Sequence, residues 1–216
     1  MWDGGRHTLH VTEYRDLGAF EDRARVYESG RYARLHFEIV DRALDLALAA
    51  APQPGRVLDV GCGTGYLLRT LAGRLPEAEA FEGVDAASTM IEVARARAAE
   101  ECADDTRLSF RQGVAEHLPF EPDTFDLLIS TTSFDHWADQ QAGLTECARV
   151  LRPGGHLMLV DQFSLLLTPT LLRSRRGKAR TKHRATILAS NAGFEVPSWH
   201  HVYAVIINGM AARKPA

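Results

Sequence analysis

The sequence predicts an α/β fold: a doubly wound, mostly parallel β-sheet covered by helices on both faces. Apolar stretches typical of strands alternate with amphipathic stretches typical of helices between residues 57 and 160. The segment 125–131 carries the apolar run of a parallel strand that is buried on both faces. A glycine-rich turn connects the first strand directly to a helix, and such turns bring backbone N–H groups close to a bound ligand.

The composition is that of a globular domain. The 216 residues are 45% hydrophobic and 25% charged, with a formal net charge of -3. No apolar run approaches the roughly 18 residues of a membrane span, and the first residues lack the apolar core of a signal peptide. The cysteines show neither a C-x-x-C pair nor metal-ligand spacing, so we expect a cytoplasmic protein without a disulfide framework or a metal site.

The N-terminal region divides into two parts. Residues 1–20 are polar and show no clear period, and we expect a mobile arm or a lid there. Residues 21–216 are expected to form a single domain that begins with a helical segment over 21–51, ended by the prolines of 52–55. The apolar positions of this helical segment recur at steps of three and four and include Leu35, Ile39, Ala43, Leu46 and Ala50.

The turn after the first strand has glycines at alternate positions, followed by a helix predicted over 66–74. These glycines are Gly61, Gly63 and Gly65. A dinucleotide-binding turn would place its third glycine one residue later, against a pyrophosphate. Asp59 precedes the first glycine by two residues, and a carboxylate there opposes a pyrophosphate and suits a cationic ligand. We therefore expect a positively charged ligand at this turn; the alternative is a turn that simply links strand and helix.

Asp85 ends the predicted second strand, 80–85, at the same edge of the sheet. An acidic residue in this position can accept hydrogen bonds from both hydroxyls of a ribose. Taken alone, Asp85 also fits the cap of the helix that follows.

A histidine follows the predicted fourth strand. His136 lies between Asp135 and Trp137. Histidine is the side chain whose charge changes near neutral pH, so His136 is our candidate general base. Asp135 would orient His136 or bind a cationic substrate. The alternative is a hydrogen-bonded corner without a chemical role.

The C-terminal part predicts further alternation and a basic segment. A helix ending at 152–155 precedes a strand over 156–161, and two closing strands are expected over 194–201 and 202–211. The segment 162–190 is basic and could receive a carboxylate, a phosphate or an acidic carrier protein. The alternative is a solvated helix face that balances an acidic surface. Its clustered basic residues are Arg173, Arg175, Arg176, Lys178, Arg180, Lys182 and Arg184.

Several stretches, taken in order, resemble motifs of the class I S-adenosylmethionine-dependent methyltransferases, in particular those of the ubiquinone/menaquinone type. The stretches are F-x-x-R-A-x-x-Y at 20–27, D-V-G-C-G-T-G at 59–65, G-V-D-A-A-S-T-M-I-E-V-A at 83–94, G-V-A-E-H-L-P-F at 113–120, T-S-F-D-H-W at 132–137 and R-V-L-R-P-G-G-H-L-M-L-V-D at 149–161. The resemblance covers about residues 20–212.

The resemblance implies a Rossmann-like methyltransferase fold with seven strands, the last antiparallel, and a variable insertion over 162–190. It implies S-adenosylmethionine as cofactor and methyl transfer to a small molecule. By position, Ala86 and Met90 pack on the adenine, and Tyr27 lies over the cleft unless it merely packs between helices. The residues expected to bind the cofactor are Tyr27, Asp59, Gly61, Gly63, Gly65, Asp85, Ala86, Met90, Val114, Ala115 and Ser130.

The chain departs from the family pattern at three positions. The aspartate that accepts a hydrogen bond from the adenine is Val114 here, which leaves the backbone of Ala115 for that contact. The helix-capping serine is Ala87, and we expect Ser88 to take over the cap. The first of two histidines is Asp135. The departures at Val114 and Asp135 favour one alternative, an S-adenosylmethionine-binding regulator or scaffold without transfer activity.

A nucleic-acid methyltransferase is a further alternative. The near-neutral net charge argues against a general nucleic-acid-binding surface. Neither an N-P-P-Y nor a D-P-P-Y tetrad follows the predicted fourth strand, where residues 130–133 read S-T-T-S. We therefore expect a small-molecule acceptor, anionic if the basic segment binds it, and neither a nucleic-acid nor a membrane partner.

Overall fold

The computed structural model describes residues 17–29, 31–164 and 181–216. Seven strands form one sheet in the order β3-β2-β1-β4-β5-β7-β6. Pairing is parallel from β3 to β5, and β7 is antiparallel to both of its neighbours, as predicted for the last strand. The strands are β1 Arg56–Val60, β2 Ala80–Asp85, β3 Leu108–Gln112, β4 Phe125–Thr131, β5 Leu151–Gln162, β6 Ser198–Tyr203 and β7 Ile207–Arg213.

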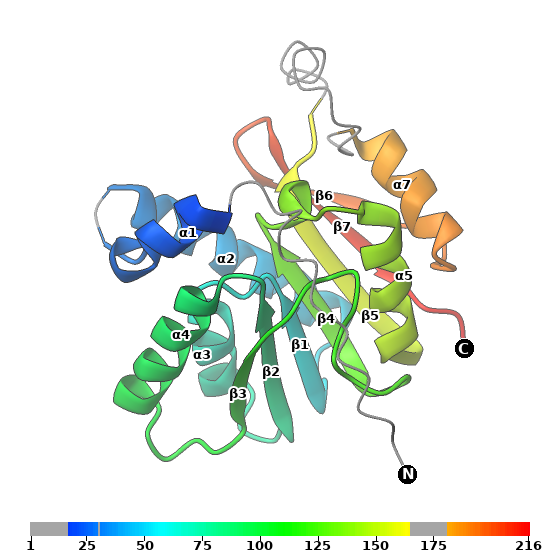
Figure 1. Ribbon diagram of the computed structural model, residues 1–216. Coiled ribbons are helices and arrows are strands. Elements are labelled where there is room, and N and C mark those ends of the chain that lie inside the picture. Colours follow the sequence, from blue (N-terminus) through cyan, green and yellow to red (C-terminus); the bar gives the residue numbers. More distant parts are fainter. Residues whose placement is uncertain (1–16, 30, 165–180) are drawn as a thin grey trace.

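Helices cover both faces of this sheet because parallel strands need crossover connections (Figure 1). One face carries α2 (Arg31–Ala50), α3 (Tyr66–Arg74) and α4 (Ser88–Glu101). The other carries α5 (Gln140–Val150) and α7 (Lys182–Asn191). Three short helices, α1 (Leu17–Arg23), η2 (Ala24–Val26) and η3 (Phe134–His136), complete the described chain. Within it, none of the helices has the length and apolarity to cross a membrane.

Neighbouring residues of the central strands belong to two separate cores. Val57 and Leu127 pack with α2 and α3, whereas Leu58 and Leu128 pack with α5 and α7. All four side chains are fully buried. A strand covered on both faces needs apolar residues on both, which explains the apolar run predicted for β4.

The chain order creates a crevice at one edge of the sheet. From β1 the chain moves outward through β2 to β3, and then returns to β4 on the opposite side of β1. The connections on the two sides diverge at this point, so the carboxyl ends of β1 and β4 border an open space.

The leading helical segment differs from the prediction. A helix begins at Leu17, inside the range expected to be an arm, whereas residues 1–16 lie outside the described residues. The continuous helix expected over 21–51 is interrupted near Ser29, whose hydroxyl donates to the Val26 carbonyl and closes a turn. Leu35 is 37% exposed rather than in the core. The buried face of α2 is instead formed by Ala33, Ile39, Val40, Ala43, Leu44 and Ala47.

The bounds of the last three strands also differ, and β6 begins at Ser198 rather than at 194. β5 begins at Leu151 rather than at 156, because residues 152–155 form an irregularity between the Leu151 and His156 pairs with β4. The closing strands were predicted to meet at 201–202, but the connection lies at 204–206. Ala204 has a φ of 45° and Val205 is 71% exposed, so this apolar stretch is a turn on the surface.

The buried centre of β4 gives a first prediction. Leu128→Ala should lower the free energy of unfolding by about 2–5 kcal/mol, because it leaves a cavity between β4 and α5. Val205→Ala, at an exposed position, should change it by less than about 0.5 kcal/mol. Urea denaturation followed by circular dichroism measures both, and equal losses would contradict the two-core packing described above.

Candidate active site

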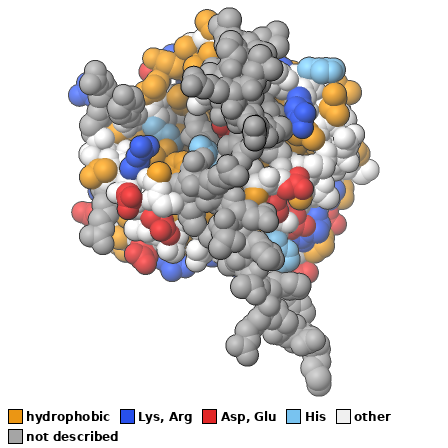
Figure 2. Space-filling model, turned by 45° about the horizontal axis from the view of Figure 1, so that its top comes forward, with side chains coloured by type: hydrophobic (Ala, Val, Ile, Leu, Met, Phe, Trp, Pro, Cys, Tyr) orange, Lys and Arg blue, Asp and Glu red, His pale blue; other side chains and the backbone are white. Residues whose placement is uncertain are grey.

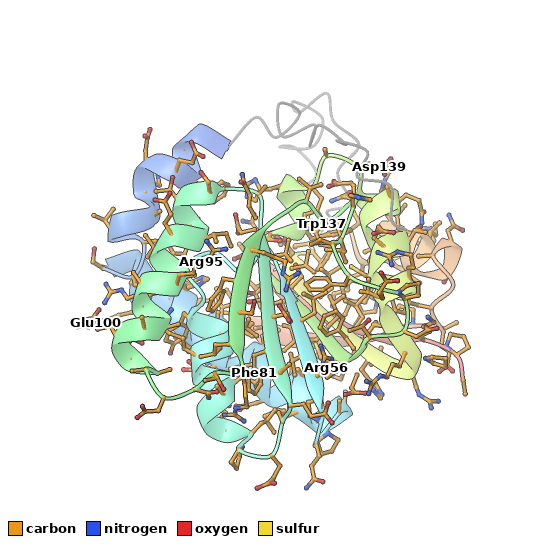
Figure 3. The ribbon with its side chains drawn as sticks, turned by 60° about the horizontal axis from the view of Figure 1, so that its bottom comes forward. Arg56, Phe81, Arg95, Glu100, Trp137 and Asp139 are labelled. Atoms are coloured by element: carbon orange, nitrogen blue, oxygen red, sulfur yellow. The ribbon has the colours of Figure 1, made fainter. Side chains whose placement is uncertain are left out.

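The crevice at the carboxyl ends of the strands contains a cleft with about 900 Å³ of empty space that is partly open to solvent. Figure 3 shows Trp137, which lines this cleft, at the opposite end of the sheet from Arg56 and Phe81. Gly65, Ser130 and Asp135 are not among its described lining residues. The predicted residues that do line it are Tyr27, Asp59, Gly61, Gly63, Asp85, Ala86, Met90, Val114, Ala115 and His136.

The three glycines of the turn have different surroundings, although each has a positive φ. A Cβ on Gly61 would lie 2.1 Å from the Ser133 hydroxyl oxygen, and one on Gly65 would lie 2.7 Å from the Phe110 ring. A Cβ on Gly63 would meet no described atom within 4 Å. Gly63 therefore presents bare backbone to the cleft, whereas Gly65 lets α3 pack against β3.

Asp85 ties the glycine turn to the second strand. Its carboxylate accepts hydrogen bonds from the Gly63 and Ala87 N–H groups, both at 2.9 Å. Burial raises the pKa of Asp85, and these two bonds oppose the rise. Each oxygen keeps a second lone pair that could accept from a ligand hydroxyl. The expectation that Ser88 caps α4 is wrong: Ala87 stands at the N-cap, and the Ser88 hydroxyl donates to Glu21 at 3.4 Å.

Asp59 is a buried carboxylate beside the turn. It is 1% exposed and lines the cleft, and its Oδ1 has no hydrogen-bond partner among the described residues. Burial, with a smaller contribution from the charge of Asp85, raises the pKa of Asp59 to about 8. A cation placed in the cleft would supply the partner that this oxygen lacks.

The loop after β4 forms the opposite wall. Thr132 has a φ of 52°, which is unusual for a β-branched residue, and its side chain hydrogen-bonds that of Tyr27. This contact joins the N-terminal helical segment to the loop. Burial raises the pKa of the Tyr27 hydroxyl, and the nearby Asp85 raises it further.

Ser133 is the polar centre of this wall. Its hydroxyl donates to the Val60 carbonyl at 3.1 Å and accepts from the Trp137 indole N–H at 3.1 Å. Ser130, buried behind it, lies 3.2 Å away, oxygen to oxygen. Ser130 thus supports Ser133, and Gly61 leaves the space that Ser133 fills.

His136 and Asp135 are adjacent in η3 but face different surroundings. His136 lines the cleft, with its ring centroid 4.9 Å from that of Phe20 in an edge-to-face contact. The backbone N–H of Asp135 donates to the buried Asp161 at 3.1 Å, which anchors η3 to the end of β5. Of these two neighbouring residues, only His136 is among the described residues that line the cleft.

The remaining wall is apolar. Val114 and Ala115 are buried and line the cleft after β3. Met90 packs with Ala24 and Ala87 beneath the cleft. This surface suits a flat apolar group, and the valine offers it no side-chain hydrogen bond.

Some lining residues were missed by the sequence analysis. His36 and Val40 project from one face of α2, and Tyr66 starts α3. The His36 ring lies 5.1 Å from that of Tyr27, and burial lowers the pKa of His36, an effect that the charge of Glu28 opposes. An i, i+4 pair on the predicted helix was the available signal for His36 and Val40.

The predicted basic segment lies mostly outside the described residues, whereas the expected lack of a metal site can be examined for the described side chains. Within the basic segment 162–190, residues 165–180 lie outside the described residues, and Lys182 and Arg184 belong to α7. Among described side chains, no group of three or more His, Cys, Asp or Glu is placed to hold a metal ion.

Comparison with known proteins identifies the family. Residues 57–155 match the model of a methyltransferase domain. The chain is 34% identical over 145 residues to the uncharacterized methyltransferase YcgJ of Bacillus subtilis, covering 67% of this chain and 54% of that protein. It is 39% identical over 120 residues to a demethylmenaquinone methyltransferase of Thermus thermophilus, covering 56% of this chain and 52% of that protein. The chain belongs to the class I S-adenosylmethionine-dependent methyltransferases.

Solved structures agree on the fold of this chain. A solved complex between the Haloferax volcanii Trm112 methyltransferase activator and a methyltransferase contains a chain that superposes with a TM-score of 0.76 at 22% identity, covering 94% of this chain and 98% of that one. Family membership makes S-adenosylmethionine the cofactor. The chain spans about half the length of the curated relatives that it matches.

The surroundings of the glycines give a second prediction. Gly65→Ala should lower the free energy of unfolding by about 1–3 kcal/mol more than Gly63→Ala, because the added methyl group collides with Phe110. Both positions have a positive φ, so their backbone strain is comparable. Urea denaturation measures stability, and equal losses would contradict a packing role for Gly65.

The buried carboxylate gives a third prediction. The pKa of Asp59 is about 8 in the folded protein against an ordinary 3.8, so the native state keeps a proton that the unfolded chain releases between these values. Its contribution therefore lowers stability as the pH rises from about 4 to 8. Asp59→Asn should be increasingly more stable than the wild type across this window, by up to about 1.4 kcal/mol per pH unit. A stability difference that does not change with pH in urea denaturation would contradict the buried, unpaired environment.

Proposed function

We propose that this protein transfers the methyl group of S-adenosylmethionine to a small-molecule acceptor bound in the cleft. The observation that carries the proposal is Asp59, a buried carboxylate with an unpartnered oxygen beside a glycine turn. A bound cation such as the ammonium or sulfonium of this cofactor would favour the ionised form of Asp59 and lower its raised pKa, whereas a pyrophosphate would raise that pKa further. Gly63 adds bare backbone at the same place, and Asp85 adds acceptor oxygens for a ribose.

The residues divide the cleft into two halves. In the first half, Tyr27 would lie over the cofactor. The residues that would hold the cofactor are Asp59, Gly61, Gly63, Asp85, Ala86, Met90, Val114 and Ala115. When bound, S-adenosylmethionine supplies a methyl group activated by a sulfonium. The space left for an acceptor is bordered by apolar and aromatic side chains, which exclude water. These side chains are Phe20, His36, Val40 and His136.

His136 is the proton acceptor in this proposal. Its ring borders the acceptor space from η3, and Phe20 fixes it by an edge contact. A base is needed for an acceptor hydroxyl, which is protonated at neutral pH. Asp135 acts through the backbone, by anchoring η3 on Asp161.

The described lining favours an uncharged acceptor. It contains the carboxylates of Asp59 and Asp85 and no lysine or arginine. A carboxylate or phosphate acceptor would therefore depend on the basic segment 162–190, much of which lies outside the described residues. The relatives' names support a range of acceptors, including demethylmenaquinone.

Location and partners complete the proposal. Three free cysteines suit a reducing, cytoplasmic environment. On the face shown in Figure 2, the described acidic and basic side chains are interspersed rather than separated by sign. A small molecule is therefore the partner that we propose.

Two substitutions test the two halves separately. Asp85→Ala should weaken binding of S-adenosylmethionine by about 10- to 100-fold in calorimetry, because charge-assisted hydrogen bonds are lost. His136→Asn should leave that affinity unchanged and lower turnover by about 10²- to 10⁴-fold, with product detected by mass spectrometry after incubation with a panel of acceptors.

The outcomes distinguish the alternatives. Tight cofactor binding without methylated product across the panel would indicate a regulator or scaffold. Salt-dependent binding to RNA or DNA, with methylation of it, would indicate a nucleic-acid methyltransferase. Unchanged cofactor affinity in Asp85→Ala would contradict the cofactor assignment.

A further inference from the structure

A buried arginine lies behind the glycine turn and outside the cleft lining. Arg69, on α3, has a side chain that is 4% exposed. Its guanidinium binds three partners from different parts of the chain: the Thr64 carbonyl, Glu28 and Glu101. A buried guanidinium is stable where such partners satisfy its N–H groups.

The first partner belongs to the glycine turn itself. Arg69 Nη1 donates to the Thr64 carbonyl at 2.5 Å. Helical side chains lean toward the N-terminus of their helix, so Arg69 naturally reaches back to the turn that precedes α3. Thr64 lies between Gly63 and Gly65, and this bond restrains the conformation of both peptide units.

The second partner belongs to the N-terminal cover, which we define as residues 17–29. Arg69 Nη2 donates to both carboxylate oxygens of Glu28, at 3.0 and 2.9 Å, and the Glu28 side chain is 11% exposed. Glu28 directly follows Tyr27, whose hydroxyl reaches Thr132 across the cleft. The charge of Glu28 also acts on His36. Arg69 is therefore hydrogen-bonded both to the glycine turn, through Thr64, and to the N-terminal cover, through Glu28.

The third partner is remote from the cleft. Glu101 ends α4 and accepts from Arg69 Nε at 2.8 Å, with a side chain that is 43% exposed. It also lies 3.8 Å from Arg97. Glu101 therefore shares the arginine with Glu28 but touches neither the cover nor the glycine turn, and it provides a matched control.

We propose that Arg69 is a positioning residue that clasps the N-terminal cover to the glycine turn, so that the cofactor half and the acceptor half of the cleft are ordered together. This inference rests on the proposed function for its cofactor. Lysine would not replace the arginine, because one ammonium does not match the fork geometry that Thr64, Glu28 and Glu101 require.

The test compares Glu28→Ala with Glu101→Ala, since each removes one carboxylate from the same guanidinium. Hydrogen–deuterium exchange of residues 24–29 is measured in the protein without added cofactor. Calorimetry then measures the Kd for S-adenosylhomocysteine. Glu28→Ala should speed exchange and raise the Kd by about tenfold each. Glu101→Ala should leave both unchanged, although its melting temperature falls.

Arg69→Lys keeps the charge and should reproduce the Glu28→Ala result, which guards against a misfolded alanine variant. Equal changes in Glu28→Ala and Glu101→Ala would overturn the proposal and leave Arg69 a structural residue. Faster exchange with an unchanged Kd would overturn the link to the cofactor site. A wild-type protein that binds no S-adenosylhomocysteine would refute the proposed function, and the exchange data would still decide whether the clasp exists.

Discussion

One carboxylate fixes the ligand-binding end of this protein. Asp85 accepts hydrogen bonds from the N–H groups of Gly63 and Ala87, and so joins the glycine turn to the start of α4. The turn and β2 are further joined by the Val84 carbonyl, which accepts from Gly61 and Cys62. Two helices thus begin from positions set by the same pair of parallel strands. The cleft has its shape because these backbone groups are not free to move independently.

The order of elements could be predicted because each element carries a local signal. The glycine spacing and the following pattern predicted a helix over 66–74, and α3 has these bounds. The turn at 204–206 carries no such signal, because apolar residues such as Val205 are usually buried. The position of that turn depends on how far β7 extends between β5 and β6, a tertiary constraint. Leu35 was misplaced for a related reason, since the buried side of α2 is set by the sheet beneath it.

The cleft lining was predictable where chain spacing fixes a residue relative to a strand end. Asp59 and Asp85 belong to this class, and both line the cleft. Gly65 was expected there too, but its surroundings are set by Phe110, which is distant in sequence. The roles of Ser133 and His36 arise from contacts with the glycine turn and with Tyr27. No sequence pattern reports such contacts, because they exist only when separate elements meet.

The order of the last two strands has a consequence for folding. β6 is made before β7, yet its hydrogen-bonding partner in the sheet is β7, which lies between it and β5. The strands β1 to β5 can therefore pair with one another without the last two strands, whereas β6 has no partner until β7 is in place. When β7 enters the gap, it pairs with β5 and β6 and closes both open edges at once. A chain without residues 207–213 in place would present two open strand edges, the kind of surface that chaperones bind.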